Sequence, residues 1–247
     1  MRTFYLTDSG KVRDHNEDSV TIVKNESGEI LMAVADGMGG HKSGEIASSI
    51  AISHLGKRFS EGVAIGSKSD AVNWLRDNIN EINTNIFKYT DNHPEATGMG
   101  TTLVIALLSK EFLLFANIGD SSGYVLKDGN LHKITSDHTL VNLLVATGEL
   151  TEEEAQKHPR KNVLMRALGA NNPAEVDIFD VDTDVDGILL CSDGLTTMLT
   201  NEQIEKVLVS EGTIAEKVAK LIKKSNNRGG LDNISISYLD KIGGDEE

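Results

Sequence analysis

Acidic residues stand at the ends of apolar runs in this chain. Asp36 closes the apolar run 30–35, Asp193 follows the run 188–191, and Asp232 precedes a third run. Short apolar runs bounded by glycines are typical of buried strands, and a carboxylate at the edge of a core is costly unless a cation meets it. We therefore expect the three acids to share one metal site.

Two further acids occupy comparable positions. Asp18 precedes a strand-like run and Asp120 follows one, while Arg13 and Glu17 add a cation and another carboxylate close to Asp18. Oxygen ligands without a Cys/His cluster favour hard cations, so Mg²⁺ or Mn²⁺ is expected here, and zinc or copper is not.

Such a site is suited to hydrolysis at phosphorus. Two divalent ions about 3.5–4 Å apart can acidify a shared water and offset charge in an in-line displacement. The planar guanidinium of Arg13 would hold the phosphoryl oxygens. A single Asp-Gly pair is more commonly a turn, and an isolated arginine is usually a solvated surface group. The joint placement of these residues is what favours a site.

Short β-like runs must position these residues. Several runs are separated by only a few residues, which permits hairpins and antiparallel pairing. The expected strands cover residues 3–7, 19–24, 30–35, 102–108, 112–118, 123–127 and 131–134, with further runs at 188–191 and 234–238.

Two segments show helical spacing instead. Apolar residues recur every three or four positions along 46–59 and 71–86, so each helix presents one apolar stripe. Shorter helices are expected to begin at Thr151, Thr200 and Thr213, because Glu or Gln stands three residues beyond each and completes a capping box. The order of the elements predicts an α+β fold, a sandwich of two antiparallel β-sheets flanked by α-helices in four layers, α-β-β-α.

Composition limits the class of protein. The 247 residues include three prolines and no Pro- or Ser-rich linker, so one domain is expected over residues 1–240, with a mobile acidic tail at 241–247. With 38 acidic against 24 basic residues the formal charge is −14, which opposes binding to nucleic acid. No apolar stretch approaches the roughly 20 residues of a membrane span, and the first residues lack a secretion signal. We expect a cytoplasmic monomer without membrane insertion.

Six short motifs follow one another along the chain. They are RDHNED at 13–18, DGMGGH at 36–41, GTT at 100–102, GDS at 119–121, SDGL at 192–195 and LDN at 231–233. The set resembles the metal-dependent Ser/Thr protein phosphatases of the 2C (PPM) type, especially their compact bacterial members, over about residues 2–240. The resemblance implies the same sandwich of two sheets flanked by helices.

The resemblance also implies a ligand set for two catalytic ions, Mn²⁺ or Mg²⁺. Asp36 is similar to the acid that bridges both ions, and the carbonyl of Gly37 to a ligand of one of them. Asp193 and Asp232 are similar to ligands of the other ion.

Further residues match supporting positions of the family. Glu17 and Asp18 resemble acids that act through waters, and Asp120, with Asp193, matches the place where bacterial relatives hold a third ion. Arg13 matches the phosphate-binding arginine. The implied activity is hydrolysis of phosphoserine and phosphothreonine in proteins, by direct attack of a metal-bridging hydroxide. The implied partners are phosphorylated proteins and a bacterial Ser/Thr kinase whose action the enzyme opposes.

Two positions depart from the family pattern. Met38 stands where animal relatives have the histidine proposed to protonate the leaving group, so this acid stays open between water on the third ion and His41. Ser122 stands where the family often has arginine, so no substrate contact is inferred there.

Residues 137–165 carry charge and little strand signal. On composition alone they are a solvated helical insert. The resemblance implies a flap beside the active site, which we expect to gate or select substrate.

Other chemistries fit less well. Cys191 lacks the following arginine of a thiolate phosphatase loop and is expected in the core, and the glycines at 37–40 form neither a P-loop nor a Rossmann turn. A non-catalytic adaptor that uses ions structurally and a regulatory phosphatase with one dedicated substrate remain as alternatives.

Overall fold

The computed structural model describes residues 1–40, 43–62 and 64–241, which form two stacked β-sheets. The first sheet contains β1 (Arg2–Asp8), β11 (Ile234–Asp240), β10 (Gly187–Cys191), β7 (Ser122–Lys127) and β8 (Asn130–Lys133), in this spatial order. All its neighbouring pairs are antiparallel. The first and last strands of the fold therefore lie side by side.

The second sheet is also antiparallel throughout. Its spatial order is β2 (Asp18–Lys24), β3 (Ile30–Met38), β5 (Leu103–Leu108), β6 (Leu113–Ile118) and β9 (Asp177–Val181), while the short β4 (Gly100–Thr101) pairs with the end of β3. Strand β9 is the last strand in this order, and no other strand of the described residues lies along its outer edge.

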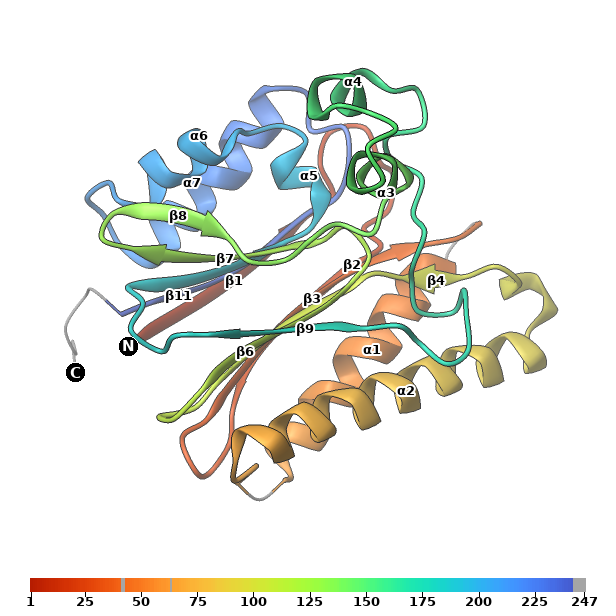
Figure 1. The fold of residues 1–247 in the computed structure, drawn as a ribbon, viewed down its shortest axis with the longest axis horizontal. Coiled ribbons are helices and arrows are strands. Elements are labelled where there is room, and N and C mark those ends of the chain that lie inside the picture. The colour runs from red at the N-terminus through yellow and green to blue at the C-terminus, as the bar shows by residue number, and fades with distance from the viewer. Residues whose placement is uncertain (41–42, 63, 242–247) are drawn as a thin grey trace.

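Helices cover the outer face of each sheet, as Figure 1 shows. The second sheet is covered by α1 (Ser43–Ser60) and α2 (Lys68–Asn92), which is followed by a 3₁₀ turn (Pro94–Ala96). The first sheet is covered by α5 (Asp193–Thr196), α6 (Asn201–Leu208) and α7 (Ile214–Asn227). This four-layer arrangement confirms the predicted fold class.

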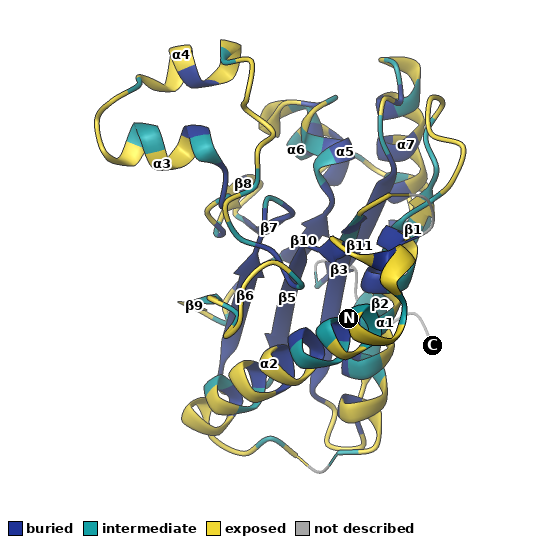
Figure 2. Cartoon of the chain, turned by 90° about the vertical axis from the view of Figure 1, so that its right-hand side faces the viewer, coloured by how far each residue is buried: buried dark blue, intermediate teal, exposed yellow. Residues whose placement is uncertain are grey.

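Both sheets bury apolar side chains on two faces, which explains why several strands are continuous apolar runs. Val34, Val104 and Leu190 belong to the core between the sheets, whereas Leu31 and Ile105 face the helices. Figure 2 shows the central strands as the buried interior of the molecule. The predicted stripe of α2 is confirmed, since all five of its apolar residues are buried: Ala71, Leu75, Ile79, Ile82 and Ile86.

The flap (137–165) contains two short helices, α3 (Leu140–Ala146) and α4 (Glu152–Lys157). Figure 2 shows both helices standing away from the layered body, with α4 largely exposed and α3 partly so. The capping box at Thr151 forms as predicted, as do those at Thr200 and Thr213. None of the described helices is long and apolar enough to cross a membrane.

Three local predictions differ from the structure. The strand at 30–35 continues to Met38, because Gly37 and Met38 pair with β4. Strand β9 was not expected, since it carries the acids Asp177 and Asp180, lies at the edge of its sheet and has no fully buried residue. In α1 the predicted stripe is only partly confirmed: Ala51, Leu55 and Phe59 are buried, but Ile46 and Ile50 are half-buried, and Ala47 is fully buried instead.

Candidate active site

The strand register brings the first two acids together. Asp18 begins β2 and lies directly opposite Asp36 on β3. Side chains that face each other across an antiparallel pair are neighbours, and like charges there are unfavourable. Asp18 is 7% exposed, so its charge has little water around it.

Two more acids come from the other sheet. Asp193 is the first residue of α5, just beyond β10, and Asp232 lies just before β11. These two strands are neighbours, and a side chain at Gly194 would meet the Asn233 carbonyl oxygen at 2.0 Å. Glycine at 194 therefore permits the close approach of the two segments that carry the acids.

The acids act on one another as a cluster, which we call the acid cluster: Asp18, Asp36, Asp120, Asp193 and Asp232. Burial, reinforced by neighbouring carboxylates, raises the pKa of Asp18 to about 7 and that of Asp120 to about 7. Burial and Asp232 raise the pKa of Asp193 to about 6, although Arg13 opposes the shift. The pKa of Asp36 is raised well above its usual value, chiefly by burial and then by Asp18. A nearby cation would reverse every one of these shifts.

Two buried oxygens of the acid cluster have no hydrogen-bond partner in the part of the chain that the structure describes. Asp18 accepts from the Ser192 hydroxyl with Oδ2 at 2.7 Å, but its Oδ1 is buried and unpaired. Asp193 Oδ1 is also buried and unpaired. Leaving a buried oxygen unsatisfied costs about 1–3 kcal/mol, and oxygen donors of this kind are the ligands that Mg²⁺ and Mn²⁺ prefer. The donor set therefore fits a hard divalent ion.

The side chains do not stand as a ready-made ligand cage. Within the described ranges, no three His, Cys, Asp or Glu side chains are close enough together to hold an ion. Asp232 Oδ2 instead accepts from Arg13 Nη2 at 2.8 Å. The half-exposed Arg13 guanidinium thus lies at the rim of the acid cluster, where an anion can reach it.

Glu17 and Gly37 are joined through the backbone. The Glu17 carbonyl accepts from Gly37 N–H at 3.1 Å and from the Ser48 hydroxyl at 2.6 Å. A Cβ at Gly37 would lie 2.1 Å from the Gly44 carbonyl oxygen, so only glycine fits under the start of α1. Burial raises the pKa of Glu17, whose charge Arg13 partly offsets.

The GTT and GDS motifs hold Asp36 by its backbone. Asp36 N–H donates to Thr102 Oγ1 at 3.0 Å, and the Thr101 hydroxyl donates to Asp36 O at 2.9 Å. Thr102 Oγ1 also lies 2.7 Å from Ser121 Oγ, beside Asp120. Two motifs that carry few ligands therefore link the positions of Asp36 and Asp120.

Asn233 joins three loops and was not identified from the sequence as a site residue. Its Oδ1 accepts from Glu17 N–H at 2.8 Å, and its Nδ2 donates to the carbonyls of Ser9 and His15 at 3.0 and 2.9 Å. The sequence offered one indication of this role: Asn233 belongs to the LDN motif, in which only Asp232 is given a function.

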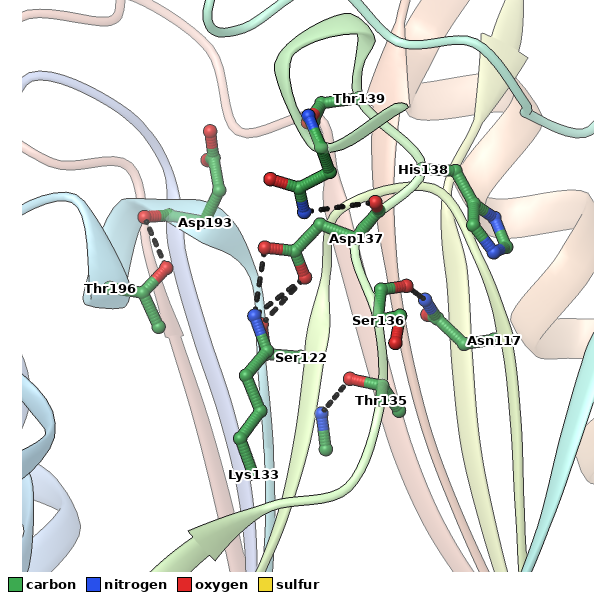
Figure 3. A network of polar contacts seen from close by, with 12 residues as sticks. Asn117, Ser122, Lys133, Thr135, Ser136, Asp137, His138, Thr139, Asp193 and Thr196 are labelled. Carbon is green, nitrogen blue, oxygen red and sulfur yellow. Dashed lines mark hydrogen bonds and ion pairs between the residues drawn. The ribbon is translucent and has the colours of Figure 1, made fainter. Parts of the chain in front are cut away.

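Asp137 was also missed, and it lies beside the acid cluster. Its carboxylate raises the pKa of Asp120 as a secondary cause after burial and Asp193. Lys133 Nζ donates to both its oxygens at 2.6 and 2.8 Å, as Figure 3 shows. Ser122 Oγ is 3.5 Å from Asp137 Oδ1, so Ser122 contacts the flap stem.

Two candidate residues from the sequence remain, His41 and Cys191. His41 lies outside the described residues, so its expected role stays a prediction. Cys191 is fully buried, as predicted, and burial raises the pKa of its thiol to about 12. A reactive thiolate at this position is therefore not available for nucleophilic chemistry.

Comparison with known proteins decides the family. The model of the family described as protein phosphatase 2C matches residues 10–232. The chain belongs to the protein phosphatase 2C family. Phosphatases of this family depend on Mn²⁺ or Mg²⁺.

Several relatives of this phosphatase 2C chain match it over nearly its whole length. Serine/threonine phosphatase stp of Listeria welshimeri is 41% identical over 242 residues, covering 98% of this chain and 96% of that protein. Protein phosphatase PhpP of Streptococcus pneumoniae is 35% identical and covers 97% of each chain.

Solved structures match the fold as well. Serine/threonine phosphatase Stp1 from Staphylococcus aureus superposes with a TM-score of 0.92 at 38% identity, covering 98% of this chain and 95% of that one. The serine/threonine phosphatase PstP/Ppp of Mycobacterium tuberculosis gives a TM-score of 0.82 at 35% identity, with 97% of both chains covered.

Proposed function

We propose that this phosphatase 2C chain hydrolyses phosphoserine and phosphothreonine residues of proteins. The observation that carries the proposal is the acid cluster itself, with two unpaired buried oxygens and Arg13 at its rim. Relatives named serine/threonine phosphatase, at about 40% identity over the whole chain, support the choice of substrate.

Two divalent ions would be held by residues of the acid cluster. Asp36 would contact both, the Gly37 carbonyl one of them, and Asp193 and Asp232 the other. When bound, Mn²⁺ or Mg²⁺ supplies Lewis acidity and an acidified water for attack at phosphorus. The carboxylates of the acid cluster would supply the negative charge that holds the ions, and Arg13 lies at the rim of this cluster through its bond to Asp232.

Glu17 and Asp18 would support the ions indirectly, by binding waters that are themselves metal ligands. Asp18 is already oriented by Ser192, whose own oxygen accepts from Ser235 N–H at 2.9 Å. A carboxylate fixed in this way can orient a ligand water without being a ligand itself.

Arg13 would bind the phosphoryl group. Its guanidinium can donate two parallel hydrogen bonds to phosphate oxygens, and its present bond to Asp232 keeps it turned toward the acid cluster. Binding of phosphate would replace this exposed contact, which is a small loss because exposed ion pairs contribute about 0–1 kcal/mol.

A third ion at Asp120 and Asp193 is part of the proposal. Burial and Asp193 raise the pKa of Asp120 to about 7, so a cation there would be favoured. Met38 cannot donate a proton, and the leaving-group acid would be a water held at this place or His41.

The flap would select among protein substrates. Leu143, Val163 and Met165 are exposed apolar residues on it, beside the stem that carries Asp137. A phosphopeptide would contact the flap, whereas a small phosphate ester would not. The substrates would be products of a bacterial Ser/Thr kinase. The cytoplasmic location and the monomeric state stay predictions.

The test is hydrolysis of p-nitrophenyl phosphate and of a phosphothreonine peptide, each with and without Mn²⁺. We expect turnover of both substrates that requires the ion. If neither substrate were hydrolysed with Mn²⁺ in excess, the phosphatase proposal would be wrong and a non-catalytic adaptor would be the better account.

A further inference from the structure

One carboxylate lies between the two stems of the flap. Asp177, the first residue of β9, places Oδ2 3.0 Å from His138 Nε2 and accepts from Arg166 Nη1 with Oδ1 at 3.0 Å. His138 is the second residue of the flap, and Arg166 directly follows its end. Arg166 Nε is also 3.3 Å from Glu175 Oε2. Both stems are thereby fastened to the edge strand of the second sheet.

The hydrogen bonds define the tautomer of His138. The backbone N–H of Gly119 donates to His138 Nδ1 at 3.2 Å, so Nδ1 must present its lone pair. In the neutral ring the proton is then on Nε2, from which it donates to Asp177. The side chain is 8% exposed, which leaves little water to replace either partner.

The same contacts hold the loop that carries Asp120. His138 N–H donates to Gly119 O at 2.9 Å. Asn117 Nδ2 donates to Gly119 O at 3.3 Å and to Ser136 O at 2.9 Å, and Figure 3 shows His138 and Asn117 beside the flap stem. The Asp120 loop and the start of the flap therefore form one hydrogen-bonded unit.

We propose that Asp177 is a positioning residue for the active site. Asp177 keeps the His138 proton on Nε2, so that Nδ1 can accept from Gly119 N–H. This bond holds the loop that carries Asp120 in a fixed position relative to the flap. The geometric part of this proposal is independent of the metal. Its consequence for Mn²⁺ binding rests on the ion-binding role proposed for Asp120.

An amide cannot replace this carboxylate. In Asp177→Asn a single oxygen must serve two donors. If that oxygen faces His138, the amide NH₂ faces the Arg166 guanidinium, and two donors meet. If the oxygen faces Arg166, the NH₂ group faces His138 Nε2, which must then accept and can no longer carry the ring proton. The proton moves to Nδ1, where it meets the N–H of Gly119. Either orientation releases one stem.

The first test is the tautomer of His138 in the Mg²⁺-loaded protein, read from imidazole ¹H–¹⁵N correlation spectra. We expect the proton on Nε2 in the wild type. A wild-type ring that carries its proton on Nδ1 overturns the proposal.

The second test is tryptic cleavage of the native protein after Lys157, Arg160 and Lys161, the exposed basic residues of the flap. Asp177→Asn should be cleaved about fivefold faster, as expected for the loss of one ordinary hydrogen bond. The matched control is Asp180→Asn on the same strand, where an exposed acid pairs with Lys68 at 2.6 Å; it should be cleaved at the wild-type rate. Equal rates in all three proteins contradict the proposal.

A second variant covers the case in which Asp177→Asn does not fold. Arg166→Gln removes one arm only, so it should speed cleavage and leave the His138 tautomer unchanged. A wild-type cleavage rate in this variant argues against the proposal that Asp177 holds the two flap stems.

The Mn²⁺ requirement separates the two proposals. Asp177→Asn should need about tenfold more Mn²⁺ for half-maximal turnover, the usual size of an effect on groups that orient a ligand. Asp120→Asn, measured in parallel, should slow turnover. If Asp120→Asn turns over like the wild type while Asp177→Asn is still cleaved faster, the ion role of Asp120 fails and the positioning of the flap by Asp177 stands. If Asp120→Asn slows turnover but Asp177→Asn needs no extra Mn²⁺, the coupling of Asp177 to Asp120 fails.

Discussion

The acid cluster sits on strands and strand ends between two covered sheets, whereas the flap consists of two short helices with most of their residues exposed. The acid cluster contains interactions that destabilise the folded state, namely buried like charges and unpaired oxygens. The surrounding core keeps these groups in place. The flap has few such destabilising interactions and is held to the body mainly by its stems. The contrast suggests that the rigid part performs the chemistry and the lightly attached part selects the substrate.

The largest effect is expected at the centre of the acid cluster. Asp36→Asn should lower turnover by about a thousandfold or more, because an ion supplies several kcal/mol of charge stabilisation at the transition state. The same change removes a buried charge, so the metal-free protein should unfold at a higher temperature. The control is Asp77→Asn, at an exposed position on α2, which should alter neither quantity. Wild-type turnover in Asp36→Asn would show that the acid cluster is not catalytic.

Arg13 tests the rim of the same region. Arg13→Lys keeps the charge but loses the planar pair of donors, so kcat/KM should fall about 10- to 100-fold. Arg76→Lys, an exposed substitution on α2, is the matched control. If Arg13→Lys were as active as this control, bidentate phosphate binding by Arg13 would be excluded.

Shortening the flap within residues 146–160 tests the other side of the comparison. The kcat/KM for a phosphopeptide should fall about tenfold, as expected when about 1.4 kcal/mol of contact is lost. Turnover of p-nitrophenyl phosphate should change less than about twofold, since a small ester has no reach to the flap. Equal losses on both substrates would mean that the flap acts on the chemistry and has no selective role.

The smallest expected effect is on stability. In the metal-free protein the folded-state pKa values of Asp18 and Asp193, about 7 and about 6, exceed ordinary values, so the folded state binds more protons. Stability should therefore fall as pH rises from about 4 to about 7, with a loss of about 10 °C or more in melting temperature. Calorimetry of chelated protein at pH 5 and pH 8 measures this, and Mn²⁺ should remove the difference. A melting temperature that rises over this interval would contradict the raised pKa values.

Much of the fold could be predicted from local pattern. The stripe along α2 and the capping boxes at Thr151 and Thr213 depend on residues three or four positions apart, so a single segment carries the whole signal. Strand β9 could not be found in this way, because it has no continuous apolar run, and its place at the edge of the sheet is defined only by the assembled sheet.

The acids of the site were predictable because each stands at the end of an apolar run. The residues that orient them were not. Asn233 acts on Glu17, 216 residues away in sequence, and Asp177 acts on His138, 39 residues away. A hydrogen bond between distant loops leaves no periodic trace. The arrangement of Ser192 with Asp18 was hidden for the same reason, since it joins the two sheets.

Crystals grown with abundant Mn²⁺ test the central claim most directly, through anomalous scattering at the manganese edge. The account predicts at least two peaks among the carboxylates of Asp36, Asp193 and Asp232. A well-ordered structure from such crystals, with these carboxylates still paired as Asp232 is with Arg13 and no anomalous peak among them, would contradict it.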